Sequence, residues 1–154
     1  MAFDPESLQG GAAFIDGEFV PLAAARIPIL DWGFLRSDAT YDVVHVWKGS
    51  FFRLEDHLDR FERNMKALQL NSPLDRDHTR DTLMRLVAKS GLQDSYVEMI
   101  CTRGTAPIGS RDPRMCENRF YAFAAPFMFI ANEEQRARGL RMVISERPRI
   151  AKES

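Results

Sequence analysis

The feature that most constrains this chain is a change in the spacing of its apolar residues. From residue 12 to residue 52 the pattern is that of short strands separated by turns, and Leu54 to Leu68 then follows a helical period. Strand-like alternation returns at Ser95. Because hairpins come first, helices second and more strands last, with no βαβ alternation, the sequence predicts an α+β fold with a mainly antiparallel sheet and two helices.

Two hairpins are predicted in the first third of the chain. Ala12 to Val20 forms two short strands around Asp16-Gly17, a dipeptide typical of tight hairpin turns. Thr40 to Trp47 is rich in valine and aromatic residues, and Lys48-Gly49-Ser50 turns it back into Phe51-Phe52. Between the hairpins, Pro21, Pro28 and Asp31-Trp32-Gly33 predict irregular structure.

The helices and later strands follow from apolar spacing and end signals. We expect one helix over residues 54–68 and a second that opens at Pro73 and Asp75 and closes at Ser90-Gly91. Strands are expected over residues 95–103, 119–130 and 140–146. Residues 1–11 are interpreted as a flexible arm, residues 12–146 as the domain and residues 147–154 as the start of a linker.

Composition excludes several classes of protein. The formal net charge is -1, from 21 basic and 22 acidic residues that are interspersed, so no basic stripe for nucleic acid is present. No apolar run has the length of a membrane span, and the N-terminus does not resemble a signal peptide, which indicates a cytoplasmic protein. Cys101 and Cys116 lack CxxC spacing and predict two free thiols. Three scattered histidines, His45, His57 and His78, give no metal-binding pattern.

The long segment from Gly104 to Asn118 is the least ordinary feature that the residues show by themselves. It exceeds the usual length of a connection, and Arg103, Arg111 and Arg114 lie in or beside it among glycine and proline. Arginines on such a loop can bind a carboxylate or phosphate with two nitrogens. They can equally be ordinary solvated surface residues.

Three segments, taken in order, resemble the class IV (fold-type IV) aminotransferases, which use pyridoxal 5'-phosphate. They are Asp31-Trp32-Gly33-Phe34 with the following Tyr41-Asp42-Val43, the helix motif His57-Leu58-Asp59-Arg60-Phe61, and the strand Tyr96 to Gly104 that ends in Thr102-Arg103-Gly104. The family includes branched-chain and D-amino-acid aminotransferases, aminodeoxychorismate lyases and (R)-selective amine transaminases. The resemblance covers residues 12–146 and implies the smaller N-terminal α+β domain of that fold, acting in a homodimer.

The resemblance also implies roles for individual residues. Arg60 matches the arginine that contacts the cofactor phosphate, and a planar guanidinium suits that task. Tyr41 matches an aromatic residue that faces the substrate pocket, with Val43 on the same strand face. Tyr96 and Glu98 alternate onto one strand face that lines the pocket in this family. His57 is interpreted as a residue that orients its helix, not as an acid or base.

Among the branches, the chain is most similar to the (R)-selective amine transaminases, which move an amino group between a primary amine and a keto acid. Such an enzyme needs an arginine that can receive the acid, and Arg111 is the candidate, although Ile108 stands near the position where an arginine is common. Arg36 also occupies a position that is commonly histidine, so it is a further pocket candidate. These two differences from the family pattern, at Ile108 and Arg36, affect which substrate the enzyme would accept.

Transamination needs a lysine that forms the covalent link to the cofactor. In this family that lysine follows the interdomain linker, and Lys152 matches the linker upstream of it. We therefore expect the catalytic lysine beyond Ser154, no C-terminal cofactor domain in this chain, and no transamination by the chain alone. The alternatives are a D-amino-acid or branched-chain aminotransferase, an aminodeoxychorismate-type lyase, or a non-enzymatic binding domain.

Overall fold

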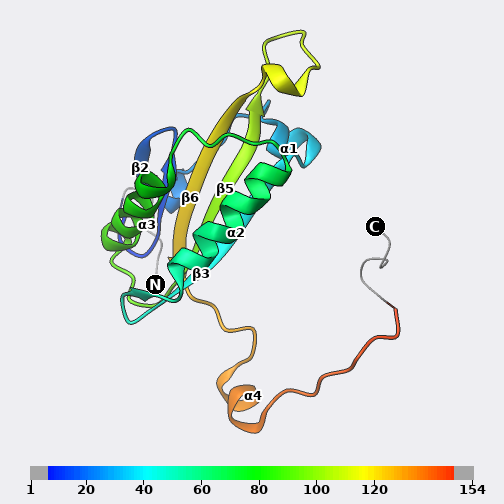
Figure 1. The fold of residues 1–154 in the computed structure, drawn as a ribbon. Coiled ribbons are helices and arrows are strands. Elements are labelled where there is room, and N and C mark those ends of the chain that lie inside the picture. The colour runs from blue at the N-terminus through cyan, green and yellow to red at the C-terminus, as the bar shows by residue number, and fades with distance from the viewer. Residues whose placement is uncertain (1–6, 148–154) are drawn as a thin grey trace.

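The computed structural model describes residues 7–147 and contains one antiparallel sheet with helices (Figure 1). The six strands lie in the order β2-β1-β6-β5-β3-β4. Their bounds are Ala12–Ile15 (β1), Glu18–Pro21 (β2), Ala39–Trp47 (β3), Ser50–Phe51 (β4), Ser95–Thr105 (β5) and Glu117–Pro126 (β6). The helices are Trp32–Arg36 (α1), Leu54–Ala67 (α2), Arg76–Ser90 (α3) and Glu133–Arg138 (α4), with 3-10 turns at Leu22–Ala24 and Pro113–Met115. The predicted α+β fold is confirmed.

Both long helices cover the same face of the sheet (Figure 1). α2 packs on β3, and α3 packs on β1 and β6. The carboxylate of Asp75 caps α3 by accepting a hydrogen bond from the backbone of His78 at 2.8 Å, and Gly91 ends the helix with φ of 65°. Both ends of α3 therefore lie where the cap residues predicted them.

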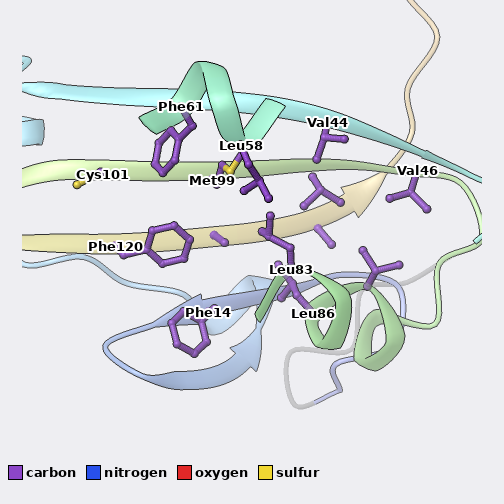
Figure 2. Close-up of a cluster of buried hydrophobic side chains, with 14 of the residues drawn as sticks. Phe14, Val44, Val46, Leu58, Phe61, Leu83, Leu86, Met99, Cys101 and Phe120 are labelled. Atoms are coloured by element: carbon purple, nitrogen blue, oxygen red, sulfur yellow. The ribbon is translucent and has the colours of Figure 1, made fainter. Parts of the chain in front are cut away.

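The hydrophobic core lies between this sheet face and the two helices (Figure 2). Leu58 and Phe61 enter from α2, and Leu83 and Leu86 enter from α3, each almost completely buried. From the sheet come Phe14, Val44, Val46, Val97, Met99, Cys101, Phe120 and Ala124. The rings of Phe61 and Phe120 meet edge to face with their centroids 6.3 Å apart.

A buried carboxylate fixes the segment that crosses the other face of the sheet. Asp31 is completely buried and accepts hydrogen bonds from the backbone N–H of Gly33 at 2.8 Å and from the hydroxyls of Thr102 at 2.9 Å and Tyr121 at 2.8 Å. A Cβ at position 33 would lie 2.5 Å from Cγ2 of Thr102, so only glycine allows this approach. Asp31 also caps α1, a short helix that the sequence did not predict.

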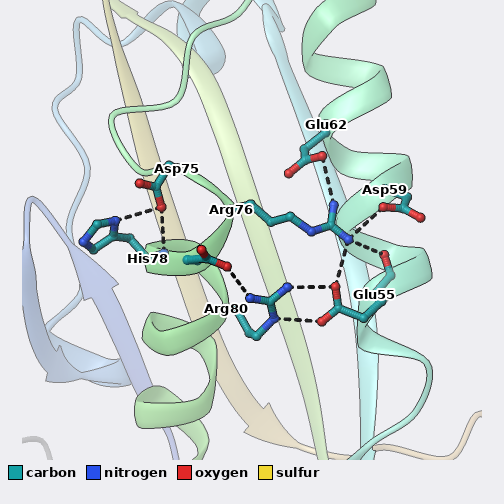
Figure 3. A network of polar contacts seen from close by, with 8 residues as sticks. Glu55, Asp59, Glu62, Asp75, Arg76, His78 and Arg80 are labelled. Atoms are coloured by element: carbon teal, nitrogen blue, oxygen red, sulfur yellow. Dashed lines mark hydrogen bonds and ion pairs between the residues drawn. The ribbon is translucent and has the colours of Figure 1, made fainter.

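An ion-pair network joins α2 to α3 on the solvent side (Figure 3). Arg76 on α3 contacts Glu55 at 2.8 Å, Asp59 at 2.7 Å and Glu62 at 2.9 Å, all on α2. Arg80 contacts Glu55 at 2.7 Å. Hydrogen bonds from Arg80 and Arg76 lower the pKa of Glu55 to about 2.

The structure corrects three details of the predicted strands. β5 extends to Thr105 and β6 begins at Glu117, so the loop between them is shorter than predicted, and β6 ends at Pro126 rather than Ile130. Residues 140–146 do not form a strand. Their apolar side chains are largely exposed, and no strand within residues 7–147 offers them backbone partners, so strand propensity alone does not order them. The charged segment before them forms α4, whose N-terminus is capped by a capping box between Asn132 and Gln135.

Parts of two predicted segments lie outside the described residues: residues 1–6 of the arm and 148–154 of the linker. The remainder of the arm lies beside α3, where the backbone N–H of Gly10 donates to the carbonyl of Ser90 at 2.8 Å. Within residues 7–147, no helix combines the length and apolar character needed to cross a bilayer.

The core predicts a contrast between neighbouring positions on α3. Leu83 is completely buried, whereas Met84 is 56% exposed. We expect Leu83→Ala to lower the free energy of unfolding by about 2–5 kcal/mol, because it removes apolar contacts and leaves a cavity. Met84→Ala should change it by less than about 1 kcal/mol. Urea unfolding measures both, and equal losses would contradict the assignment of the core.

The network of Figure 3 predicts a dependence of stability on pH. Because the folded pKa of Glu55 is about 2 against an ordinary 4.5, its stabilising effect is complete above about pH 4.5 and fades as the pH falls toward 2. Glu55→Gln should therefore lower the melting temperature at neutral pH. The difference in melting temperature between the variant and the wild type should become smaller as the pH falls from about 4.5 to 2, and also when salt is added. Asp81→Asn is the matched control, because it removes only the 3.4 Å pair with Arg85 on the exposed side of α3. Its melting temperature should differ little from that of the wild type. A Glu55→Gln effect that is independent of pH would contradict the ion-pair origin.

Candidate active site

Four of the predicted pocket residues lie together on the sheet face opposite α2 and α3. On β3, Tyr41 and Val43 alternate with core residues, and Tyr96 and Glu98 do so on β5. The register pairs Val43 with Glu98, and Tyr41 with Ile100. Paired residues of adjacent strands lie on the same face, so the two predicted pairs form one continuous surface.

A hydrogen bond organises the polar part of this surface. The hydroxyl of Tyr96 donates to Oε2 of Glu98 at 2.9 Å. Burial and this bond raise the pKa of Tyr96 to about 12, so the phenol remains a donor at neutral pH. The ring of Tyr96 stacks on Phe123 of β6, with centroids 6.0 Å apart. Tyr41 is 62% exposed, so its ring is available to a ligand.

Arg60 lies on α2 and reaches the same strand from the helix-covered side. Its Nε donates to Oδ2 of Asp42 at 2.6 Å, and its Nη2 donates to Oδ1 at 2.8 Å. His57 Nδ1 lies 2.8 Å from Oδ1 of Asp42. Burial by itself would raise the pKa of Asp42, but the bonds from Arg60 and His57 outweigh it and hold that pKa below its usual value. The contact of His57 agrees with its predicted role of orienting the helix.

The surroundings of Arg60 suit a phosphate group. Its side chain is 53% exposed although Asp42 is almost completely buried. It lines a polar cavity of about 400 Å³ whose other walls are Phe52, Arg53, Asp56, His57, Asp59 and Arg63. β4 pairs with Val46 and Trp47, and the backbone N–H of Phe52 donates to the carbonyl of His45, so residues 39–44 of β3 form the edge of the sheet beside Arg60. The guanidinium nitrogen Nη1 has no hydrogen-bond partner among residues 7–147, which leaves donors for an anion at this edge.

The two remaining pocket candidates are not on this surface. Arg36 ends α1, where its guanidinium lies 4.4 Å from the centre of the Trp32 ring. Arg111 is exposed in the loop between β5 and β6. Two other arginines near this loop are paired: Arg103, near the end of β5, binds Asp38 at 3.0 Å, and Arg114 in the loop binds Asp112 at 2.7 Å. Arg111 has no ion pair in the described part of the chain, so its guanidinium is not tied to a carboxylate there.

Two residues of the surface and one beneath it were not predicted from the sequence. Ile100 and Phe123 complete the face, because they pair with Tyr41 and Glu98. Their membership depends on strand register, which the sequence of one strand does not show. Asp42 was part of the matched motif, but its pairing with Arg60 joins residues 18 positions apart and needs the packing of α2 on β3.

An apolar cavity of about 440 Å³ adjoins the surface where residues 22–34 cross the sheet. Ile100 and Phe123 line it from the sheet, and Leu22, Ile27 and Phe34 line it from the crossing segment. Tyr121 stands at its base, where burial and the bond to Asp31 raise its pKa. The surface that carries Tyr41, Tyr96 and Glu98 therefore adjoins an apolar cavity lined in part by Tyr121.

Comparison with known proteins places these features in a family. The family model "Amino-transferase class IV" matches residues 39–154. A putative branched-chain-amino-acid aminotransferase from Methanocaldococcus jannaschii is 27% identical over 122 residues, which are 79% of this chain and 42% of that protein. A D-alanine aminotransferase from Staphylococcus haemolyticus is 28% identical over 94 residues, 61% of this chain and 33% of that protein. The chain spans less than half the length of these curated relatives.

Solved structures agree on the fold. For a branched-chain aminotransferase from Thermoproteus uzoniensis with norvaline, the TM-score is 0.64 at 23% identity, and the match covers 76% of this chain and 41% of that one. For the branched-chain amino acid aminotransferase of Escherichia coli, the TM-score is 0.67 at 15% identity, and the match covers 80% of this chain and 42% of that one. The sheet and its helices thus match the N-terminal domain of these structures. Since the family model also matches well over half of its residues, the chain belongs to the class IV aminotransferases.

Proposed function

We propose that this chain forms one wall of the cofactor and substrate site of a transaminase that uses pyridoxal 5'-phosphate. The observation that carries the proposal is the convergence at β3: Tyr41 and Val43 on the open face, and Arg60 at the adjoining sheet edge. Bound pyridoxal phosphate would supply the electron withdrawal that lets an amino group move between carbon atoms. The residues of this chain would bind and orient the reacting molecules.

Phosphate recognition falls to Arg60. One side of its guanidinium is held by Asp42, and the exposed side faces a cavity that Arg53 and Arg63 also line. Arg53 is paired with Asp56, but both side chains are largely exposed. Because the partner of Arg60 is almost completely buried, Arg60 is better fixed in direction. A fixed guanidinium suits a phosphate because its N–H groups match phosphate oxygens in one plane.

Substrate recognition falls to the open face. The carboxylate of Glu98, held by Tyr96, would attract an ammonium group and repel a carboxylate placed at the same point. Such a surface favours an amine whose reacting carbon carries no carboxylate, as in the (R)-selective amine transaminases. The acid partner would then be received by Arg111 or Arg36, which lie at the α1 and loop end of the sheet.

Other assignments within the family have support of their own. The relatives named above are branched-chain and D-alanine aminotransferases, so an amino acid substrate is the alternative, together with an aminodeoxychorismate-type lyase. A non-enzymatic binding domain is the second alternative. A homodimer in the cytoplasm completes the proposal and follows from the family resemblance.

The phosphate assignment predicts a selective loss of affinity. Arg60→Lys keeps a positive charge but removes the planar fork, so it should weaken binding of pyridoxal 5'-phosphate by about tenfold or more. Binding of pyridoxal, which lacks the phosphate, should change by less than about twofold. Equilibrium dialysis or fluorescence titration measures both constants.

Lys66→Ala is a control for non-specific attraction of the phosphate to positive charge. Lys66 is an exposed cation six residues further along α2, about 9 Å away by helical rise, so its loss tests non-specific charge. Equal weakening by the two variants, or equal weakening for pyridoxal and its phosphate, would remove Arg60 from the phosphate site.

The substrate assignment predicts an order among amines. In a protein that carries this chain together with the family lysine, the visible absorption of bound pyridoxal phosphate should change on addition of (R)-1-phenylethylamine. It should change less with the (S)-amine, D-alanine or L-leucine. Glu98→Gln removes the charge at constant shape and should reduce the preference for the (R)-amine over D-alanine by about tenfold.

Each other outcome points to a named alternative. A stronger response to D-alanine or L-leucine would favour an amino acid aminotransferase. No spectral response to any amine, with pyridoxal phosphate still bound, would leave a binding domain or a lyase.

A further inference from the structure

We propose that Asp42 is a positioning residue for cofactor phosphate: it holds Arg60 so that the free edge of the guanidinium points into the polar cavity beside β3. The inference rests on the proposed function. Asp42 touches neither the phosphate nor the substrate in this proposal, and it acts only through Arg60.

The first support is the geometry of the pair. Asp42 has a side chain only 1% exposed, whereas the side chain of Arg60 is 53% exposed. The carboxylate receives Nε at 2.6 Å and Nη2 at 2.8 Å, so two nitrogens of the fork are held in one plane. The orientation of the third nitrogen, Nη1, is then determined, and it has no partner among residues 7–147.

The second support is the way His57 completes the arrangement. A carboxylate only accepts hydrogen bonds, so Nδ1 of His57, 2.8 Å from Oδ1 of Asp42, must carry a hydrogen. The 3.2 Å approach of Nη2 of Arg60 to the same Nδ1 is then a contact between two donors, not a hydrogen bond. Asp42 thus accepts from two residues of α2, one turn apart, and is fixed from two directions.

The third support is the location of Asp42 between two residues of the open face. Tyr41 and Val43 flank it on β3 and point to the opposite side of the sheet. Asp42 itself points away from that face, so it can affect a ligand only through Arg60. A long arginine side chain loses much freedom when it binds a ligand, and an arginine already held in place loses less.

A purely structural role for Asp42, as an anchor of α2 on β3, makes different predictions. Loss of an anchor would weaken all ligands in proportion to the loss of folded protein. Loss of a positioning residue would weaken only ligands that carry the phosphate, and only while Arg60 is present.

A double-mutant cycle separates these roles. Binding constants for pyridoxal 5'-phosphate and pyridoxal would be measured for the wild type, Asp42→Asn, Arg60→Lys and the double variant. We expect Asp42→Asn to weaken the phosphate ester by about tenfold with pyridoxal nearly unchanged, because the amide of asparagine presents a donor to the donors of Arg60. The double variant should lose no more than Arg60→Lys alone, since Asp42 acts through Arg60.

Two further variants keep the test decisive if Asp42→Asn does not fold. Asp42→Glu keeps the charge and should recover part of the lost affinity. His57→Gln leaves the pair of Asp42 with Arg60 in place and should weaken only the phosphate ester, by about threefold. This variant decides the question if Asp42→Asn does not fold, and melting curves identify that case.

The outcomes also distinguish this inference from the proposed function. If Arg60→Lys leaves the ratio of the two binding constants unchanged, the phosphate assignment itself fails. If Arg60→Lys changes the ratio but Asp42→Asn and His57→Gln do not, only the positioning role fails. Additive losses in the double variant would also overturn it.

Discussion

The register of β3 against β5 is the constraint on which the candidate site depends. Side chains of a strand alternate between faces, so Asp42 meets α2 while Tyr41 and Val43 lie on the open face. A slip of one residue would place Asp42 in the substrate surface and Tyr41 against the helix. The pairing of Val43 with Glu98, and the packing of Val44 and Val46 in the core, make that slip costly.

The buried carboxylate of Asp31 sets the second boundary of the open face. It ties the end of the crossing segment to Thr102 of β5 and Tyr121 of β6. A buried charge is stable only when hydrogen bonds satisfy it, and the two hydroxyls and one backbone N–H do so here. The crossing segment thereby covers the apolar cavity at one end of the sheet and leaves the sheet face near Tyr96 uncovered.

Local signals predicted most of the fold. Asp16-Gly17 and Lys48-Gly49 placed both hairpin turns, and Asp75 and Gly91 placed the ends of α3. The predictions were wrong where partners decide the outcome. Residues 140–146 have strand-like residues, but no strand among residues 7–147 pairs with them, and α1 depends on Asp31, whose hydroxyl partners are 71 and 90 positions away. The candidate site shows the same difference. Strand alternation predicted that Tyr96 and Glu98 share a face, but the hydrogen bonds between Asp42 and Arg60 depend on tertiary packing.

Two carboxylates on adjacent strands illustrate how partners divide the work of the site. Asp42 is paired with a guanidinium, so its charge is neutralised locally and its effect is to orient Arg60. Glu98 receives a phenol, which donates a hydrogen bond without neutralising the charge. In the proposed site, Glu98 would attract an ammonium group to the open face, while the N–H groups of Arg60 that have no partner among residues 7–147 would donate hydrogen bonds to a phosphate. Because side chains alternate along a strand, Asp42 with Arg60 lies on one face of the sheet and Glu98 on the other. A ligand that carries both a phosphate and an amine would, in the proposed site, reach both faces at the exposed edge of β3.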